Sequence, residues 1–230
     1  MSARQYDIEF LGQPSRIWAD DPVIEEDYRN GRLHEHQMLA WIHNNVPSGG
    51  IWIDAGANIG NHSMAFALKA SEVLAFEPAP NNFELLERNV QGLDNVLPIR
   101  LGLASGADLL KLTPTAQGRN SQFALQPGTG PNVMVAALDD LVPRNAKVGL
   151  IKIDVEGMEE AVIAGAMAII ARQRPEIFVE VWHQNTLDFI SGRLLGRMGY
   201  QLIECWNDAP TFHFSASGRY PVTYKPRELQ

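Results

Sequence analysis

Cysteine and positive charge are both scarce in this sequence, and each shortage excludes a class of protein. Cys205 is the single cysteine among 230 residues, so the chain cannot form an internal disulfide and does not resemble a disulfide-stapled secreted protein. Acidic residues outnumber basic ones, and the formal net charge is −8. Nucleic-acid-binding proteins usually concentrate Lys and Arg on one face. We therefore expect no nucleic-acid partner.

Long apolar runs are also missing. The longest, residues 161–171, contains Gly165 and falls well short of the roughly 20 residues that a membrane-spanning helix needs. Residues 1–7 lack the apolar segment of a signal peptide. We therefore expect a soluble, cytoplasmic protein without a transmembrane segment. Its length and 45% hydrophobic content fit one α/β domain with additions.

The stretch that organises the chain is residues 51–63. Three apolar residues lead into Asp54, and Gly56 and Gly60 then flank a short turn that contains Asn58. This pattern predicts a strand, a tight turn and a helix. Glycine lets a ligand approach the backbone closely, and the first amide groups of a helix have no partners of their own. We expect the turn to bind a ligand.

The residues of the turn limit which ligand it binds. The dinucleotide-binding fingerprint needs glycine at its first, third and sixth positions, which here hold Gly56, Asn58 and Asn61. Two of the three glycines are missing, and a carboxylate at the strand tip, Asp54, would repel pyrophosphate. A second acid, Glu77, ends the next apolar run, about where an acid that binds ribose hydroxyls is expected. The pair predicts a nucleoside without phosphates.

Four motifs occur in order along the chain. They are Ile-Asp-Ala-Gly-Ala-Asn-Ile-Gly at 53–60, Phe-Glu-Pro at 76–78 with Asn89, Leu-Asp-Asp-Leu at 138–141, and Ile-Lys-Ile-Asp-Val-Glu-Gly at 151–157 with Glu159, Gly165 and Ala166. Over roughly residues 33–183, these motifs resemble the FkbM family of S-adenosylmethionine-dependent methyltransferases. The resemblance implies S-adenosylmethionine as cofactor and methyl transfer as the reaction.

Strand and helix patterns alternate after the turn, which predicts an α/β fold. We expect a doubly wound, mostly parallel seven-stranded sheet. The resemblance implies the Rossmann-like methyltransferase fold, in which the last strand is reversed. Residues 1–48 show no strong sheet signal and predict an N-terminal helical cap or lid, before a cofactor-binding methyltransferase domain at 49–230. Residues 102–131 are rich in glycine and polar residues. We assign 117–122 to the rim of the active site, with a disordered insertion as the alternative.

Polar residues follow the predicted strands at the edge where a ligand would bind. Asp154, Glu156, Glu180 and His183 would place three carboxylates and an imidazole around one crevice, and like charges crowded in a cleft need a reason. A positively charged sulfonium in the ligand would be such a reason, because it attracts carboxylates. In addition, a hydroxyl acceptor must lose a proton as it attacks the methyl carbon, so the site needs a base. We expect Asp154 beside the sulfonium and one of Glu156, Glu180 or His183 as the base.

The cofactor itself would be held by Asp54, Gly56, Asn58, Gly60, Glu77 and Asp154. In this prediction Asp54 lies near the amino-acid or ribose portion, and Glu77 binds the ribose hydroxyls. Two questions stay open. Asp154, Glu156 and Glu180 are also ligands that would suit Mg²⁺ or Ca²⁺. Glu35 either reaches the cofactor or substrate, as the resemblance suggests, or lies with His34 and His36 on a solvated helix face.

The expected reaction is O-methylation of a hydroxyl on a small-molecule, sugar or glycolipid-type acceptor. An Asn or Asp followed by two prolines and an aromatic residue is associated with methylation of nucleobase amines. Here residues 154–157 read Asp-Val-Glu-Gly instead. Two alternatives are a non-catalytic binding module on a methyltransferase scaffold and an NAD-dependent oxidoreductase.

Overall fold

A seven-stranded sheet runs through the computed structural model, which describes residues 3–22, 24–114, 123–126, 130–226 and 229. The strands lie in the order β12-β13-β11-β10-β3-β4-β5. Their bounds are β3 Ile51–Ala55, β4 Glu72–Phe76, β5 Val96–Ile99, β10 Val148–Ile153, β11 Glu176–Glu180, β12 Gln201–Trp206 and β13 Thr211–Ser215.

The sheet is mostly parallel. Strands β3, β4, β5, β10 and β11 pair in parallel, whereas β13 runs antiparallel to both of its neighbours. This confirms the predicted α/β fold with seven strands and a reversed last strand. From β3 the chain first adds strands on one side and later adds β10 and β11 on the other. In such sheets the ligand crevice lies at the carboxyl ends of the strands where the order reverses, which is here between β3 and β10.

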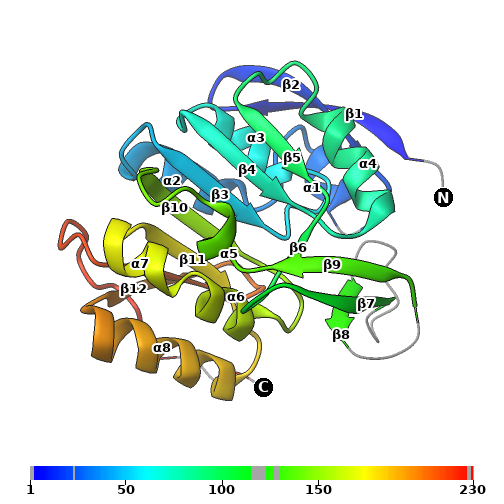
Figure 1. Ribbon diagram of the computed structural model, residues 1–230. Helices are drawn as coiled ribbons and strands as arrows, with labels where there is room; N and C mark the ends of the chain where they lie inside the picture. Colours follow the sequence, from blue (N-terminus) through cyan, green and yellow to red (C-terminus); the bar gives the residue numbers. More distant parts are fainter. Residues whose placement is uncertain (1–2, 23, 115–122, 127–129, 227–228, 230) are drawn as a thin grey trace.

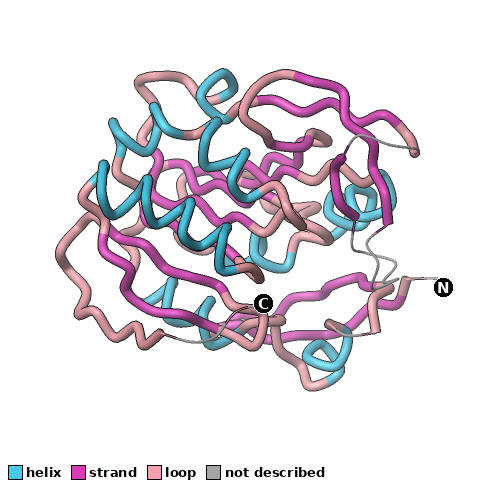
Figure 2. The backbone as a smooth tube through the Cα atoms, turned by 90° about the horizontal axis from the view of Figure 1, so that it is seen from below, coloured by secondary structure: helices cyan, strands magenta, loops and turns pink. Residues whose placement is uncertain are grey.

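Helices cover both faces of this sheet (Figures 1 and 2). Because successive side chains of a strand point to opposite faces, Ile53 and Ile151 pack on one side and Trp52 and Leu150 on the other. The first side carries α5, α6, α7 and α8, and the second carries α2, α3 and α4. The helices are α1 Glu25–Arg29, α2 His36–Asn45, α3 Asn61–Ala67, α4 Pro80–Asn89, α5 Leu138–Leu141, α6 Glu159–Gly165, α7 Met167–Gln173 and α8 Gln184–Met198.

The N-terminal segment contains sheet as well as helix, so the expectation of no sheet signal in residues 1–48 is wrong. β1 Arg4–Phe10 and β2 Gln13–Ala19 form an antiparallel hairpin. Ile8 and Ile17 are buried on its inner face, but most of the remaining positions are exposed and polar, so the alternation is short and weak in the sequence. The helices α1 and α2 also lie in this segment, for which a helical cap was predicted.

The hairpin is fastened to the sheet through Asn89 of α4. The amide of Trp18 donates to Asn89 Oδ1 at 2.6 Å, while Asn89 Nδ2 donates to the carbonyls of Trp18 at 2.9 Å and Ile59 at 2.8 Å. The guanidinium carbon of Arg88 lies 3.3 Å from the centre of the Trp18 ring. One side chain therefore joins the hairpin to the glycine turn after β3.

A second, four-stranded sheet occupies much of the segment 102–131, which is rich in glycine and polar residues. It consists of β6 Gly102–Leu103, β7 Asp108–Pro114, β8 Phe123–Gln126 and β9 Asn132–Ala136, in the order β6-β9-β7-β8, and lies to one side of the main sheet (Figure 1). Leu112 and Val133 are buried within it. Each of its apolar runs is short and is surrounded by glycine and polar residues, so the sequence pattern did not reveal a sheet. Residues 117–122, assigned to the rim of the active site, lie outside the described residues.

The helical segment after β10 is divided at Ala166 into α6 and α7. Gly165 ends α6 where the helix meets β6, and its backbone approaches the Ala104 carbonyl so closely that a Cβ would lie 2.1 Å from the oxygen. The absence of a side chain at Gly165 therefore permits close packing of α6 at this point. In the described part of the chain, no helix combines the length and apolar composition required to cross a membrane.

Replacing Gly165 tests this close packing. Gly165→Ala should lower the free energy of unfolding by about 1–3 kcal/mol, the usual cost of overpacking. Gly192→Ala is the matched control, because a Cβ at Gly192 in α8 would meet no atom within 4 Å and should raise stability by up to about 1 kcal/mol. Urea unfolding measures both changes. Equal effects of the two substitutions would contradict the packing argument.

Candidate active site

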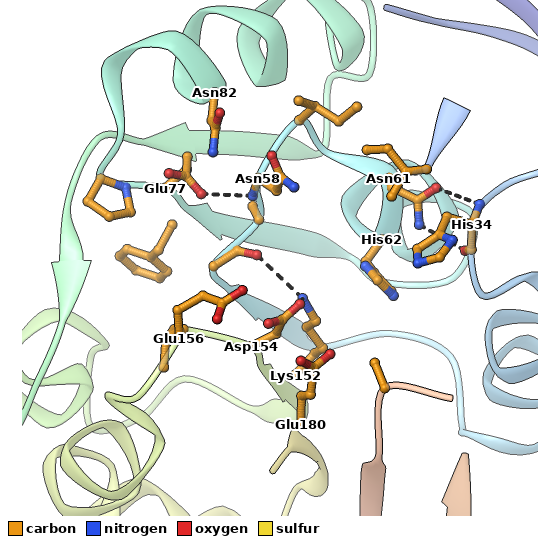
Figure 3. Close-up of a pocket in the computed structure, with 18 of the residues that line it drawn as sticks. His34, Asn58, Asn61, His62, Glu77, Asn82, Lys152, Asp154, Glu156 and Glu180 are labelled. Carbon is orange, nitrogen blue, oxygen red and sulfur yellow. Dashed lines mark hydrogen bonds and ion pairs between the residues drawn. The ribbon is translucent and has the colours of Figure 1, made fainter. Parts of the chain in front are cut away.

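A pocket opens at the carboxyl ends of β3, β4, β10 and β11. It encloses about 1250 Å³ of space, open solvent at its mouth included. Figure 3 shows Glu77 and Asn58 on one side of the pocket and Lys152, Asp154 and Glu180 gathered on the other. The segment before α2 contributes a further wall with Tyr28, His34 and Glu35. The predicted crevice is therefore present, and the N-terminal segment helps to form it.

The turn after β3 depends on its glycines. Gly56 has φ +77°, and a Cβ there would lie 1.8 Å from the carbonyl oxygen of Asp154. Gly60 has φ +92° and precedes α3, where a Cβ would lie 2.9 Å from a methyl carbon of Leu86. Gly56 and Asn58 line the pocket, whereas Gly60 is not among the lining residues. Gly60 instead brings the start of α3 against α4.

Glu77 lies in the pocket wall at the end of β4, as predicted. Its carboxylate accepts hydrogen bonds from two backbone amides, Asn58 N at 2.9 Å and Ala79 N at 2.8 Å. Burial raises the pKa of Glu77 to about 8, although the two amide bonds oppose the rise. A carboxylate offers about four acceptor positions, so Glu77 can still accept hydrogen bonds from a ligand.

Asp54 does not reach the pocket. Its side chain has no exposed surface and accepts a hydrogen bond from the Ser63 hydroxyl at 2.6 Å. Its other oxygen lies 3.6 Å from Lys152 Nζ. The structure therefore places Asp54 behind the wall of the pocket, where it is the counter-ion of a buried lysine, rather than in contact with a ligand.

Lys152 is a pocket residue that sequence reasoning missed. It lies on β10 directly beside Asp54, and its Nζ is 3.2 Å from Asp154 Oδ2 and 3.4 Å from the Gly56 carbonyl. Burial alone would lower the Lys152 pKa, but the carboxylates of Asp154 and Asp54 raise it above its usual value. Lys152 is therefore charged. A lysine inside the otherwise apolar run 148–153 was the signal that could have revealed it.

Asp154, Glu156 and Glu180 all line the pocket, as predicted. Ile153 and Val179 are paired across β10 and β11, so the residues that follow them, Asp154 and Glu180, lie side by side. The Trp182 indole donates to Glu180 Oε1 at 2.6 Å. Burial, and then the charge of Asp154, raise the pKa of Glu180 to about 9.

His183 is not brought into the pocket, contrary to expectation. Its side chain is exposed, and it is the residue before α8. Glu180 and Trp182 both line the pocket, and the chain is still extended at His183. Alternate side chains of an extended segment point in opposite directions, so His183 is directed away. This removes one of the three candidate bases.

Glu35 contacts the pocket through a buried pair. Its carboxylate lies 2.8 Å from Nε2 of His62, and both side chains are 9% exposed. Burial alone would raise the Glu35 pKa, but the contact with His62 lowers it below its usual value. Of the two interpretations of Glu35, the structure supports the one that brings it to the pocket.

Asn61, the first residue of α3, holds this N-terminal wall in place. Its side-chain oxygen accepts hydrogen bonds from the Tyr28 hydroxyl at 3.1 Å and the His34 amide at 3.0 Å. Its Nδ2 donates to the His34 carbonyl at 3.0 Å. Asn61 thus stands where the dinucleotide-binding fingerprint has its third glycine, and it holds the N-terminal wall of the pocket in place.

No metal centre is apparent in the described residues. Among them, no group of three or more His, Cys, Asp or Glu side chains is arranged to hold a metal ion. Asp154 is instead paired with Lys152, and Glu180 with the Trp182 indole.

Comparison with known proteins assigns the family. A family model described as the methyltransferase FkbM domain matches residues 54–202, more than half of the chain. The chain belongs to the FkbM methyltransferase family. The matched region contains the pocket residues from Asn58 to Glu180 and ends in β12. The resemblance seen in the sequence motifs is confirmed.

Two curated fungal proteins are similar to parts of this family member. Methyltransferase 1 of Beauveria bassiana (strain ARSEF 2860) is 30% identical over 148 residues, which cover 52% of this chain and 59% of that protein. Methyltransferase sdnD of Sordaria araneosa is 42% identical over 74 residues, covering 30% of this chain and 29% of that protein. The chain therefore spans less than two thirds of the length of either relative.

Two solved structures share the fold. Methyltransferase FkbM from Methylobacillus flagellatus KT aligns with a TM-score of 0.55 at 19% identity, over 74% of this chain and 45% of its own. The Thermus thermophilus 16S rRNA N2 G1207 methyltransferase, solved with AdoMet and guanosine, aligns with a TM-score of 0.54 at 11% identity, over 94% and 50%. At these identities the likeness is one of fold.

The buried lysine gives a first prediction for the site. Lys152→Met should lower the free energy of unfolding by about 3–5 kcal/mol, because it leaves buried carboxylates without their cation. Adding Asp54→Asn should recover part of the loss, which a double-mutant cycle in urea measures. Lys147→Met, at an exposed position just before β10, is the control. A loss no larger than that of the control would contradict the role given to Lys152.

The pKa of Glu180 predicts how stability depends on pH. The pKa rises from 4.5 to about 9 on folding, so between these values the folded state keeps a proton that the unfolded state has lost. Stability should therefore fall as the pH rises through this window. Glu180→Gln should flatten the curve, whereas Glu84→Gln, exposed on α4, should leave it unchanged. Denaturant unfolding at several pH values provides the measurement, and identical slopes in all three proteins would refute the expectation.

Proposed function

We propose that the protein is an S-adenosylmethionine-dependent methyltransferase that acts on a hydroxyl of a small-molecule, sugar or glycolipid-type acceptor. The hydrogen bond from the Asn58 amide to Glu77 carries this proposal. In a phosphate-binding turn the backbone amides point at the ligand's anion. Here the amide of Asn58 is occupied by a carboxylate of the protein. That amide is therefore not free to bind a phosphate, whereas the remaining acceptor positions of Glu77 can receive ribose hydroxyls, which argues against NAD.

The residues of the pocket fit the proposed cofactor. The side-chain oxygen of Asn58 is buried and has no hydrogen-bond partner among the described residues, so it is available to a donor on a ligand. Asn58 and Glu77 would hold the ribose, and apolar side chains of Phe76, Leu101 and Leu103 line the same end, where an adenine could pack. When bound, S-adenosylmethionine supplies a methyl group activated by a positively charged sulfur.

The carboxylates on the opposite side of the pocket suit that positive charge. Asp154, Glu156 and Glu180 line this side, and Lys152 is already shared between Asp54 and Asp154. A cationic sulfur would therefore gain attraction there, and it would gain more in a buried site than in water. An acceptor hydroxyl positioned beside these groups could give up its proton to one of them.

The same carboxylates argue against a nucleic-acid acceptor. Phosphate groups would meet acidic side chains at the pocket and a chain of net charge −8, whereas nucleic-acid binding depends on Lys and Arg contacts to phosphate. A small hydroxyl compound without phosphate fits the charge of the pocket better.

Calorimetric titration tests the proposal directly. S-adenosylmethionine and its demethylated product S-adenosylhomocysteine should both bind the wild-type protein, and NAD should not. Glu77→Ala should weaken binding about tenfold, since it removes the acceptor of the ribose hydroxyls and each such hydrogen bond contributes roughly 0.5–1.5 kcal/mol. Glu72→Ala, at the exposed start of the same strand, is the control. Circular dichroism checks that both variants fold.

Three results would count against the proposal. Absence of binding at millimolar ligand would reject the cofactor, and tight binding of NAD would favour the oxidoreductase alternative. Unchanged affinity of Glu77→Ala would show that the ribose assignment is wrong. Binding without methyl transfer to any hydroxyl compound in a radiolabelled-methyl screen would favour the non-catalytic binding module.

A further inference from the structure

Glu180 forms no ion pair with Lys, Arg or His within the part of the chain that the structure describes. It lies at the end of β11 beside Asp154, one position beyond the paired residues Ile153 and Val179. Lys152 is the cation of this cluster, but its Nζ contacts Asp154 at 3.2 Å and Asp54 at 3.6 Å. The hydrogen bond that Glu180 accepts comes from the neutral Trp182 indole.

The surroundings of Glu180 oppose a negative charge there. Burial and the charges of Asp154 and Glu35 together raise its pKa to about 9, because Lys152 and the indole bond only partly offset their effect. A cation placed in the pocket would act in the opposite direction, because opposite charges a few ångströms apart favour the ionised form. The charged and titratable groups on this side of the pocket come from four parts of the chain. They are Lys152 on β10, Asp154 and Glu156 just after β10, Asp54 on β3, Glu35 before α2 and His62 on α3.

We propose that Glu180 is the catalytic base and that the charge on the cofactor's sulfur controls its ionisation. The inference rests on the function proposed above. With the pocket empty, or with the uncharged thioether product bound, Glu180 holds a proton. With the sulfonium bound, Glu180 gives up that proton and becomes able to accept another.

The proton balance of the step is then closed within the pocket. The acceptor oxygen forms a bond to the methyl carbon as the bond between that carbon and sulfur breaks, and the bond's electron pair remains on sulfur. The hydroxyl proton passes to the Glu180 carboxylate. The positive charge lost from sulfur is thereby replaced by the proton gained at Glu180, so the net charge of the pocket is the same before and after transfer. Glu180 becomes more basic as the sulfonium charge disappears, which is when a proton must be taken up.

Proton release on cofactor binding tests this without any acceptor. Titrations of S-adenosylmethionine and of S-adenosylhomocysteine are carried out near neutral pH in buffers of different ionisation enthalpy, which reports the protons exchanged with buffer. S-adenosylmethionine should release about one proton more than S-adenosylhomocysteine, as linkage requires for a carboxyl that ionises on binding. In Glu180→Gln, which mimics the protonated side chain in shape, this difference between the two ligands should vanish.

Two further variants separate Glu180 from its neighbours. Asp154→Asn removes the largest charge that disfavours ionisation of Glu180, so it should reduce the proton release. Glu84→Gln, exposed on α4, should retain the full wild-type difference. Comparing the two ligands within each variant cancels contributions that both share.

The outcomes distinguish this inference from the function on which it rests. If both ligands bind the wild-type protein but release the same number of protons, or if the difference persists in Glu180→Gln, the control of Glu180 by the sulfur charge is refuted while cofactor binding stands. If neither ligand binds, the proposed function fails and this inference fails with it.

Discussion

The pairing of one buried lysine with two carboxylates is the constraint on which the site depends. Lys152 lies on the central strand β10, and Asp54 is its direct neighbour on β3. Both residues are almost fully buried, so neither charge is tolerable alone in this low-dielectric surrounding. Asp154, at the pocket surface, is the second carboxylate that contacts Lys152, and the Lys152 ammonium also donates to the carbonyl of Gly56. The ion pair therefore joins the two strands at the point where the sheet reverses its order, and it sets the position of the turn above them.

The remaining charges of the pocket follow from that arrangement. Because Lys152 is shared by Asp54 and Asp154, Glu180 and Glu35 must find other partners, and they find the indole of Trp182 and the imidazole of His62. These are weaker counterparts for a carboxylate than an ammonium would be. The pocket thus has a side rich in carboxyl groups that a cationic ligand would stabilise. Glu77, on the opposite side, is held by backbone amides instead.

The N-terminal segment belongs to the same structural unit as this site. Residues of the hairpin and of α2 share a hydrophobic cluster with Trp52 of β3 and Phe178 of β11, so the segment packs directly on the sheet. Asn61 and Asn89 hold it by hydrogen bonds to backbone groups. Such bonds satisfy buried polar groups that would otherwise destabilise the fold. The wall formed by His34 and Glu35 is accordingly fixed to the helix that follows the glycine turn.

The sequence by itself determined the parallel sheet, the glycine turn and the acids at the strand ends, because strand and helix periodicity and glycine placement are local properties of the chain. It also indicated Glu77 and Asp154 correctly as pocket residues. It did not determine the hairpin or the sheet around β7, whose short alternating runs are stabilised by packing against distant elements. The sequence also did not show that Asp54 is buried behind the wall while Glu180 lines the pocket. Nor did it show that His183 points away from the pocket. Those assignments depend on which strands become neighbours and which face each side chain takes, and only the tertiary structure decides both.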